Sequence, residues 1–163
     1  MNVQDVLKAT FATTNMVFNR YLSDLTDAEL LVRPAPGCNH IAWQLGHLLV
    51  SNTTLLDTVA PGAAPELPAG FAEKYDAETA MSDSAADFLT KAEYLALFEK
   101  LNAATVIAID HLSESDLGQP SPEGWRDMFP KVGDLVVLIV MHSMMHAGQW
   151  VPIRRQLNKP IVI

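Results

Sequence analysis

The segment "HSMMHAGQW" at residues 142–150 carries two histidines whose spacing suits metal binding. His142 and His146 are four residues apart, so both imidazoles leave the same face of a helix. Two imidazoles placed in this way can share one metal ion at nitrogen–metal distances of about 2.0–2.1 Å. The residue after His142 is Ser143, where zinc metalloproteases carry a catalytic glutamate, which excludes that class of enzyme. The sequence also has no Glu-x-x-His pair, which excludes the di-iron carboxylate bundles.

A third histidine, His47, lies in the apolar stretch "AWQLGHLLV" at residues 42–50. Gly46 beside it has no side chain, which allows a neighbouring helix or a ligand to approach closely. A buried neutral imidazole has one N–H group and one bare nitrogen, and leaving either unpaired costs free energy. We therefore expect one divalent metal ion, bound by His47, His142 and His146.

The other two histidines are not expected to be ligands. His40 precedes His47 by two helical turns, which is about 10 Å along a helix axis and too far for one coordination sphere. His111 falls at the end of a predicted helix, where solvent can satisfy part of its ring.

Two tryptophans and two glutamines lie near the predicted ligands. Trp43 and Trp150 each stand four residues from one of these histidines, and we expect them to line a substrate pocket. Gln44 and Gln149 are expected to be outer partners that fix the imidazole tautomers. Core aromatics and surface glutamines are the alternative interpretation of these four positions. Cys38, the single cysteine, cannot form an internal disulfide, and no cationic neighbour in the sequence would activate its thiol.

The elements that must position these residues are helical. Hydrophobic residues recur at spacings of three and four in four segments, at about residues 3–25, 40–59, 91–112 and 132–157. Asn2, Asn39 and Thr90 are expected to cap the first three helices. The fourth is apolar on nearly all sides over its first half, which predicts that it is buried. We therefore predict an all-α fold, a four-helix bundle, in a single domain of residues 1–163.

The connection between the second and third helices, Pro61 to Thr90, is longer than a typical helix connection. Its length permits a crossover between these helices. Its spaced large apolar residues, Leu67, Phe71 and Tyr75, suggest that it covers part of the metal pocket or contributes to a dimer interface.

Composition narrows the range of partners. The net charge of −8 and the isoelectric point near 4.9 argue against nucleic-acid binding, which needs a clustered basic surface. The cations that do cluster, Arg154, Arg155 and Lys159, fall at the end of the last helix and complement its dipole. No signal peptide is evident, and the apolar run from Leu135 to Met141 is shorter than the roughly 20 residues that span a bilayer. We expect a cytoplasmic protein that does not bind membranes.

Two motifs resemble the DinB-like family of helical-bundle proteins, also called YfiT-like. They are "NHIAWQLGHLL" at residues 39–49 and "HSMMHAGQWVPIRRQLNKP" at residues 142–160. The specific part is Gly-His in the second helix together with His-x-x-x-His-x-Gly-Gln in the last. The resemblance implies a four-helix bundle with a crossover connection, commonly a homodimer. It also implies that His47, His142 and His146 hold a divalent metal whose fourth position is left to water.

The resemblance leaves the reaction open. Some similar proteins are bacillithiol transferases or mycothiol-dependent isomerases, which act on low-molecular-weight thiol conjugates. Our first hypothesis is an enzyme that activates a thiol or water and delivers it to a small electrophile, with thiol S-transfer ahead of metal-dependent hydrolysis. The rival is a non-catalytic metal-binding stress or interaction protein. Zinc, nickel and iron are the expected metals because imidazole suits them. No general base stands out in the sequence.

Overall fold

The computed structural model of the protein describes residues 1–76 and 78–161. Within this part of the chain every regular element is a helix or a helical turn, so the all-α prediction is confirmed. The α-helices are α1 (Val3–Leu22), α2 (Ile41–Val59), α3 (Lys91–His111), α4 (Glu114–Leu117), α5 (Val132–Gln149) and α6 (Val151–Gln156). Short 3-10 turns lie in the connections, at Glu29–Leu31, Ala72–Tyr75, Thr79–Met81, Ala85–Asp87 and Glu123–Trp125.

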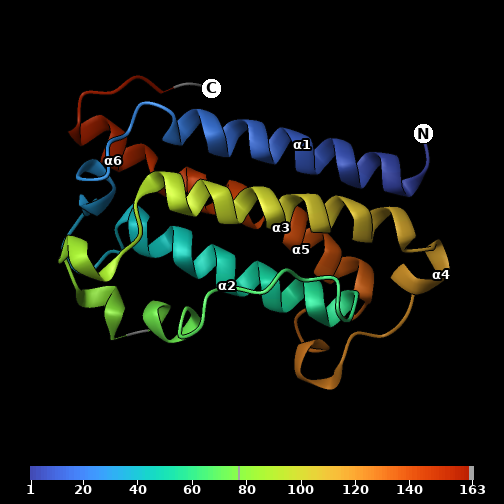
Figure 1. Cartoon of the computed structure of the whole chain (residues 1–163). Coiled ribbons are helices and arrows are strands. Elements are labelled where there is room, and N and C mark those ends of the chain that lie inside the picture. Colours follow the sequence, from blue (N-terminus) through green and yellow to red (C-terminus); the bar gives the residue numbers. More distant parts are fainter. Residues whose placement is uncertain (77, 162–163) are drawn as a thin grey trace.

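The four long helices, α1, α2, α3 and α5, run in two opposite directions (Figure 1). α1 packs against α3 and α5, and α2 packs against the same two helices. Figure 1 shows that α2 and α3 run in one direction, whereas α1 and α5 run in the other. Because α2 and α3 are parallel, the segment at residues 60–90 must return along α2 before α3 begins, and it does so (Figure 1).

Capping boxes begin α1 and α3 where they were predicted. The side chain of Asn2 accepts a hydrogen bond from the backbone N–H of Asp5, and the Asp5 carboxylate accepts one from the Asn2 N–H. Thr90 and Glu93 make the same reciprocal pair at α3. Each box satisfies donors that the first turn of a helix leaves unpaired.

The start of α2 differs from the prediction, because its cap is His40 and not Asn39. Nδ1 of His40 accepts a hydrogen bond from the Trp43 N–H at 3.1 Å. The ring proton must therefore be on Nε2, which donates to the carbonyl of Ser82 at 3.0 Å. His40 is fully buried, so this imidazole both caps α2 and ties it to the connection between α2 and α3.

The last predicted helix is divided in two at Trp150. α5 ends at Gln149, and the Trp150 N–H bonds to Ala147, three residues back, at 3.1 Å. Pro152 follows in the first turn of α6. Proline has no N–H group and its ring clashes with the carbonyl four residues earlier, which kinks or breaks a helix.

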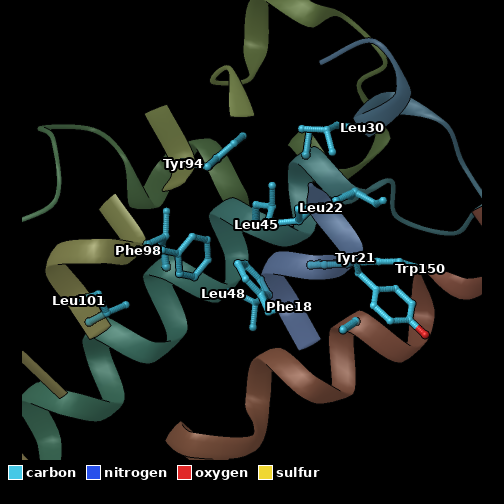
Figure 2. Packing of buried hydrophobic residues seen from close by; sticks show 14 of the residues in the cluster. Phe18, Tyr21, Leu22, Leu30, Leu45, Leu48, Tyr94, Phe98, Leu101 and Trp150 are labelled. Atoms are coloured by element: carbon cyan, nitrogen blue, oxygen red, sulfur yellow. The ribbon is translucent and has the colours of Figure 1, made fainter. Parts of the chain in front are cut away.

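The largest group of buried apolar side chains lies where α1, α2, α3 and the end of α5 meet (Figure 2). Phe18 of α1 contacts both Phe98 of α3 and Trp150, with ring centroids 4.8 and 5.3 Å apart. These aromatic contacts join elements that are far apart in the sequence.

Helix α5 was predicted to be buried, but one of its sides is exposed. It packs against α1 and α2, but Val137 and Met145 on its outer side are 50% and 51% exposed. By length and composition alone, the stretch Val132–Gln156 could cross a membrane. Core helices of soluble proteins meet the same criterion, so one such stretch is weak support for a membrane span.

The connection at residues 61–90 is packed onto α2. The ring of Tyr75 occupies the space beside Gly46, where an added Cβ would lie 1.9 Å from the ring. The Tyr75 hydroxyl is 2.7 Å from that of Tyr94 in α3, and Phe71 is buried next to Tyr75. Phe71 and Tyr75 are thus covered by their own chain and are not available to a dimer interface, contrary to one of the two expected roles. Leu67 is half-buried.

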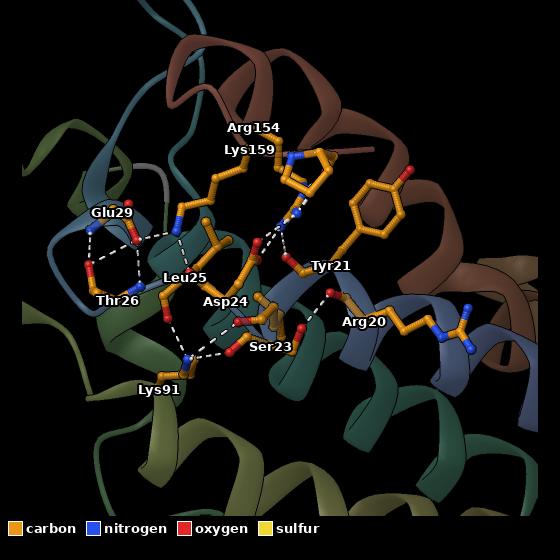
Figure 3. A network of polar contacts seen from close by, with 12 residues as sticks. Arg20, Tyr21, Ser23, Asp24, Leu25, Thr26, Glu29, Lys91, Arg154 and Lys159 are labelled. Carbon is orange, nitrogen blue, oxygen red and sulfur yellow. Dashed lines mark hydrogen bonds and ion pairs between the residues drawn. The ribbon is translucent and has the colours of Figure 1, made fainter. Parts of the chain in front are cut away.

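Arg154 in α6 does more than complement a helix dipole. Its guanidinium is fully buried and donates to both carboxylate oxygens of Asp24, at 2.6 and 3.0 Å, and to the carbonyl of Tyr21 at 2.7 Å (Figure 3). The hydrogen bonds from Arg154 lower the pKa of Asp24. This network ties α6 to the end of α1, which holds the C-terminal part of the chain in place.

Candidate metal centre

Three histidines converge between α2 and α5. His47 comes from the middle of α2, and His142 and His146 come from successive turns of α5. One ring nitrogen from each lies within 4.8 Å of the others. The spacing of four residues places two of the rings together on α5, and the packing of α2 against α5 adds the third.

Gln44 sets the orientation of the His146 ring. The Gln44 Oε1 atom lies 3.0 Å from Nδ1 of His146 and accepts a hydrogen bond from the Trp150 indole at 2.9 Å. The amide nitrogen of Gln44 donates to the carbonyl of Asn39 at 2.9 Å. An indole N–H can only donate and a carbonyl can only accept, so these partners fix which end of the amide is oxygen. His146 must therefore carry its proton on Nδ1, which leaves a bare lone pair on Nε2.

Asn52 orients His142 in the same way. The Asn52 Oδ1 atom lies 2.9 Å from Nδ1 of His142, and Asn52 itself is buried. With Nδ1 donating to this oxygen, Nε2 of His142 is also bare. Sequence analysis missed Asn52, because it lies in the polar run at residues 51–54, where a single amide does not stand out.

His47 is held by stacking. Its ring lies parallel to that of Trp43, with centroids 5.1 Å apart and an angle of 9° between the planes. The hydroxyl of Ser51 is 3.5 Å from Nε2 of His47. The Trp43 indole donates to the carbonyl of Asp76 and to the hydroxyl of Thr79, at 3.1 and 3.3 Å. The connection at residues 61–90 therefore reaches the centre through Trp43.

Burial keeps the three rings neutral. It lowers the pKa of His47 below its usual value. Burial, with a smaller contribution from the neighbouring imidazoles, lowers the pKa of His142 and of His146 to about 4. Near pH 7 all three are therefore unprotonated, which is the form that binds a metal.

These residues fit a divalent cation. Two of the rings have Nδ1 bonded to an amide oxygen, and metal-binding histidines usually donate their second ring N–H to an oxygen acceptor. Three neutral imidazole nitrogens suit zinc, nickel or iron, and three protein ligands are typical of centres that leave a position open.

A known protein family matches most of this chain. The sequence model of the DinB superfamily matches residues 10–150. The chain belongs to the DinB superfamily. The matched range includes His47, His142 and His146.

A solved structure supports the fold of this DinB-superfamily chain. It is the crystal structure of a conserved protein from Enterococcus faecalis, 21% identical, which matches 98% of this chain and 99% of its own with a TM-score of 0.73. A search of curated proteins found no match.

The other residues singled out in the sequence lie in different surroundings. Trp150 is fully buried, its indole donates to Gln44, and it is not among the residues that line the cavity beside the centre. Gln149 is exposed, and none of the hydrogen bonds among the described residues joins it to a histidine of the centre. His40 caps α2, and His111 is exposed at the end of α3. Neither belongs to the cluster of three.

A cavity adjoins the centre on the side of His47 and His142. Trp125, from the segment between α4 and α5, forms part of its wall, whereas Trp43 does not. Sequence analysis missed Trp125, and the signal was a pair of large aromatic residues, Trp125 and Phe129, in the mostly polar stretch before the last helix.

Proposed function

We propose that this DinB-superfamily protein is an enzyme whose three histidines hold one divalent metal ion, and that it activates a small thiol or a water molecule. The observation that carries the proposal is the pairing of His142 and His146 with buried amide oxygens, which leaves a bare ring nitrogen on each beside His47. A bound divalent ion lowers the pKa of a thiol or water in its open position. Zinc, nickel or iron is the expected metal.

The protein's own residues supply neutral ligands and fixed tautomers. Gln44 and Asn52 hold the imidazole protons on Nδ1 of His146 and His142. The cluster includes no carboxylate among the described residues, so the protein ligands do not neutralise the charge of a divalent ion. A centre of this kind favours an anionic ligand such as a thiolate or hydroxide.

Thiol transfer to a carbon electrophile is the reaction we place first. The substrate thiol would release its proton to solvent, its sulfur would form a bond to the electrophilic carbon, and the leaving group would depart with the bonding electron pair. The apolar cavity beside His47 and His142 favours such a carbon electrophile. Metal-dependent hydrolysis and non-catalytic metal binding are the competing outcomes of the tests below.

We further propose that the four long helices form a four-helix bundle in which residues 60–90 are the crossover from α2 to α3. The directions of the helices in Figure 1 support this description. We expect the protein to be a cytoplasmic homodimer that acts on small molecules. The net charge of −8 agrees with the absence of a nucleic-acid partner.

The metal centre can be tested by elemental analysis of protein purified without a chelator. We expect about one divalent ion per chain, as in other three-ligand centres. The variants His47→Ala and His146→Ala should each lose most of the metal. His111→Ala is the control, because His111 is exposed at the end of α3, and it should retain the metal. Full retention by both test variants would contradict the proposed centre.

The reaction can be tested with the cobalt(II) form. Addition of a low-molecular-weight thiol should produce a sulfur-to-metal charge-transfer band, which His142→Ala should abolish. The metal form should then conjugate that thiol to an electrophile, and the metal-free form should not. If no thiol changes the spectrum while esters or amides are hydrolysed, hydrolysis replaces thiol transfer. Inactivity across thiols, esters and amides would favour the non-catalytic alternative.

A further inference from the structure

The cavity beside the metal centre has a volume of about 350 Å³ and lies between α2 and α5. The rings of His47 and His142 form one side of its wall, and Leu55, Leu138 and Trp125 are the largest apolar side chains in the rest. This volume is near the lower end of the range for ligand pockets, about 300–1,000 Å³. The cavity is therefore suited to a small group such as a phenyl ring or a branched alkyl chain.

Few polar groups face this cavity. Apart from the two imidazoles and the Trp125 indole, its polar side chains are Ser51 and Thr54, and no charged side chain among the described residues lines it. The hydroxyl of Thr54 already donates to the carbonyl of Val50 at 3.0 Å. In the metal-free protein, a carboxylate or phosphate in this space would lose its hydration without gaining a cationic side chain as a partner, which costs free energy.

The aromatic part of the wall is held by its own segment. The backbone N–H of Trp125 donates to the carbonyl of Pro122 at 2.9 Å. The backbone carbonyl of Trp125 accepts a hydrogen bond from the backbone N–H of Phe129 at 2.8 Å. The rings of Trp125 and Phe129 are 6.3 Å apart. The bridge between Pro120 and Lys131 closes the base of the segment where α5 begins. The backbone of Trp125 is therefore held by hydrogen bonds within its own segment.

We propose that this cavity selects uncharged, apolar substrates by binding the aryl or alkyl group of the electrophile, and that Leu138 and Trp125 determine this specificity. The identity of the reacting partner rests on the proposed function. The preference of the cavity for an uncharged group does not, because it follows from the side chains of its wall. The polar part of a thiol co-substrate would then extend towards solvent.

Two probes of nearly equal shape test the preference: benzyl alcohol, which is neutral, and benzoate, which is an anion. Binding is measured on the full-length protein in its metal-free form, so that benzoate has no ion to coordinate. The indole N–H signal of Trp125, assigned by Trp125→Phe, is followed by NMR. We expect benzyl alcohol to shift this signal and benzoate to bind more weakly by about tenfold or more. Equal affinities for the two probes would overturn the proposal.

Substitutions in α5 test the assigned wall. Leu138→Phe should fill the cavity and weaken benzyl alcohol binding by about tenfold. Val137→Phe is the matched control, because Val137 is the neighbouring residue on the exposed side of α5. This variant should bind benzyl alcohol as tightly as the wild type does. Leu138→Lys, which keeps a flexible stem and adds a cation, should improve benzoate binding. Unchanged affinity in folded Leu138→Phe or Leu138→Lys would contradict the role of this residue.

The two proposals fail in different ways. If the metal is absent from the purified protein but metal-free protein still prefers benzyl alcohol, only the proposed function is contradicted. If the metal is bound by the three histidines but benzyl alcohol does not perturb Trp125, only the inference about the cavity is contradicted.

Discussion

A single amide, that of Gln44, connects the interior of the protein to the metal centre. Its oxygen accepts hydrogen bonds from both the Trp150 indole and His146, and its nitrogen donates to Asn39. Gln44 is buried, so none of these partners can be replaced easily by water. The amide therefore acts as a positioning group, and its loss should weaken the binding of a metal by His146.

Substitution of Gln44 by methionine should weaken metal binding by about 10–100-fold, which is the usual effect of removing an outer partner of a ligand. The reason is that Nδ1 of His146 loses its acceptor and the ring loses its fixed tautomer. Gln44→Glu keeps an acceptor and should recover part of the affinity. Gln149→Met is the control, since Gln149 is exposed on the neighbouring helix. Competition with a chromophoric chelator measures the metal affinity of the three variants. Equal losses of affinity in Gln44→Met and Gln149→Met would contradict the role of Gln44 as a positioning group.

At the scale of elements, α2 is the support on which the centre is built. It carries His47, it is capped by His40, and Tyr75 of the following connection packs against Gly46. The hydrogen bonds from Trp43 attach the same connection beside the centre. Changes in how residues 61–90 pack on α2 should therefore alter the positions of the histidines in the centre.

Gly46→Ala should destabilise the protein by about 1–3 kcal/mol, because the new methyl group overlaps the ring of Tyr75. Gly148→Ala is the matched control: Gly148 is also helical, and an added Cβ there meets no atom within 4 Å. Alanine at position 148 should be neutral or stabilising by up to about 1 kcal/mol. Urea denaturation measures both. If Gly46→Ala cost no more than Gly148→Ala, the close packing of Tyr75 would be incorrect.

The cap of α2 predicts a dependence of stability on pH. Burial, more than any other factor, lowers the pKa of His40 from its usual 6.5. As the pH falls below about 6.5, the unfolded chain takes up a proton at this residue while the folded protein does not, so stability decreases towards acid. His40→Asn keeps a capping oxygen but cannot titrate. The stability of the wild type relative to His40→Asn should therefore fall between about pH 8 and pH 5 in urea denaturation of metal-free protein. A constant difference would contradict the buried, neutral state of His40.

At the scale of the whole molecule, much of the packing is remote from the histidines. Phe18 and Phe98 join α1 to α3, and the network of Arg154 with Asp24 ties α6 to the end of α1. A chain of 163 residues buries enough apolar surface to fold without a metal ion. The ion should therefore add stability to a fold that forms without it.

Removal of the metal should lower the melting temperature by about 5–10 °C and leave the helical content unchanged. An ion present at about 100 times its dissociation constant contributes roughly 2.7 kcal/mol, which gives a shift of this size. Differential scanning calorimetry and circular dichroism, with and without chelator, measure the two quantities. In His142→Ala/His146→Ala the chelator should have no effect. Loss of cooperative unfolding in the metal-free wild type would mean that the ion is required for folding.

Features that depend on local spacing could be predicted from the sequence. The capping pairs that begin with Asn2 and Thr90 form because their partners are only three residues away. His142 and His146 share a face because residues four apart lie on the same side of an α-helix. In each case the distance is set within a single element.

Features that depend on contact between elements were decided only by the tertiary structure. Asn52 faces His142, Tyr75 fills the space beside Gly46, and Trp125 lines the cavity because separate segments pack at a particular register and depth. Trp150 is fully buried and donates to Gln44 of α2, although its spacing from His146 alone would also allow it to face a ligand. Helical periodicity determines which residues share a face, but the same face can meet several neighbours. The neighbour it does meet is selected by the packing of the whole chain, which no local pattern specifies.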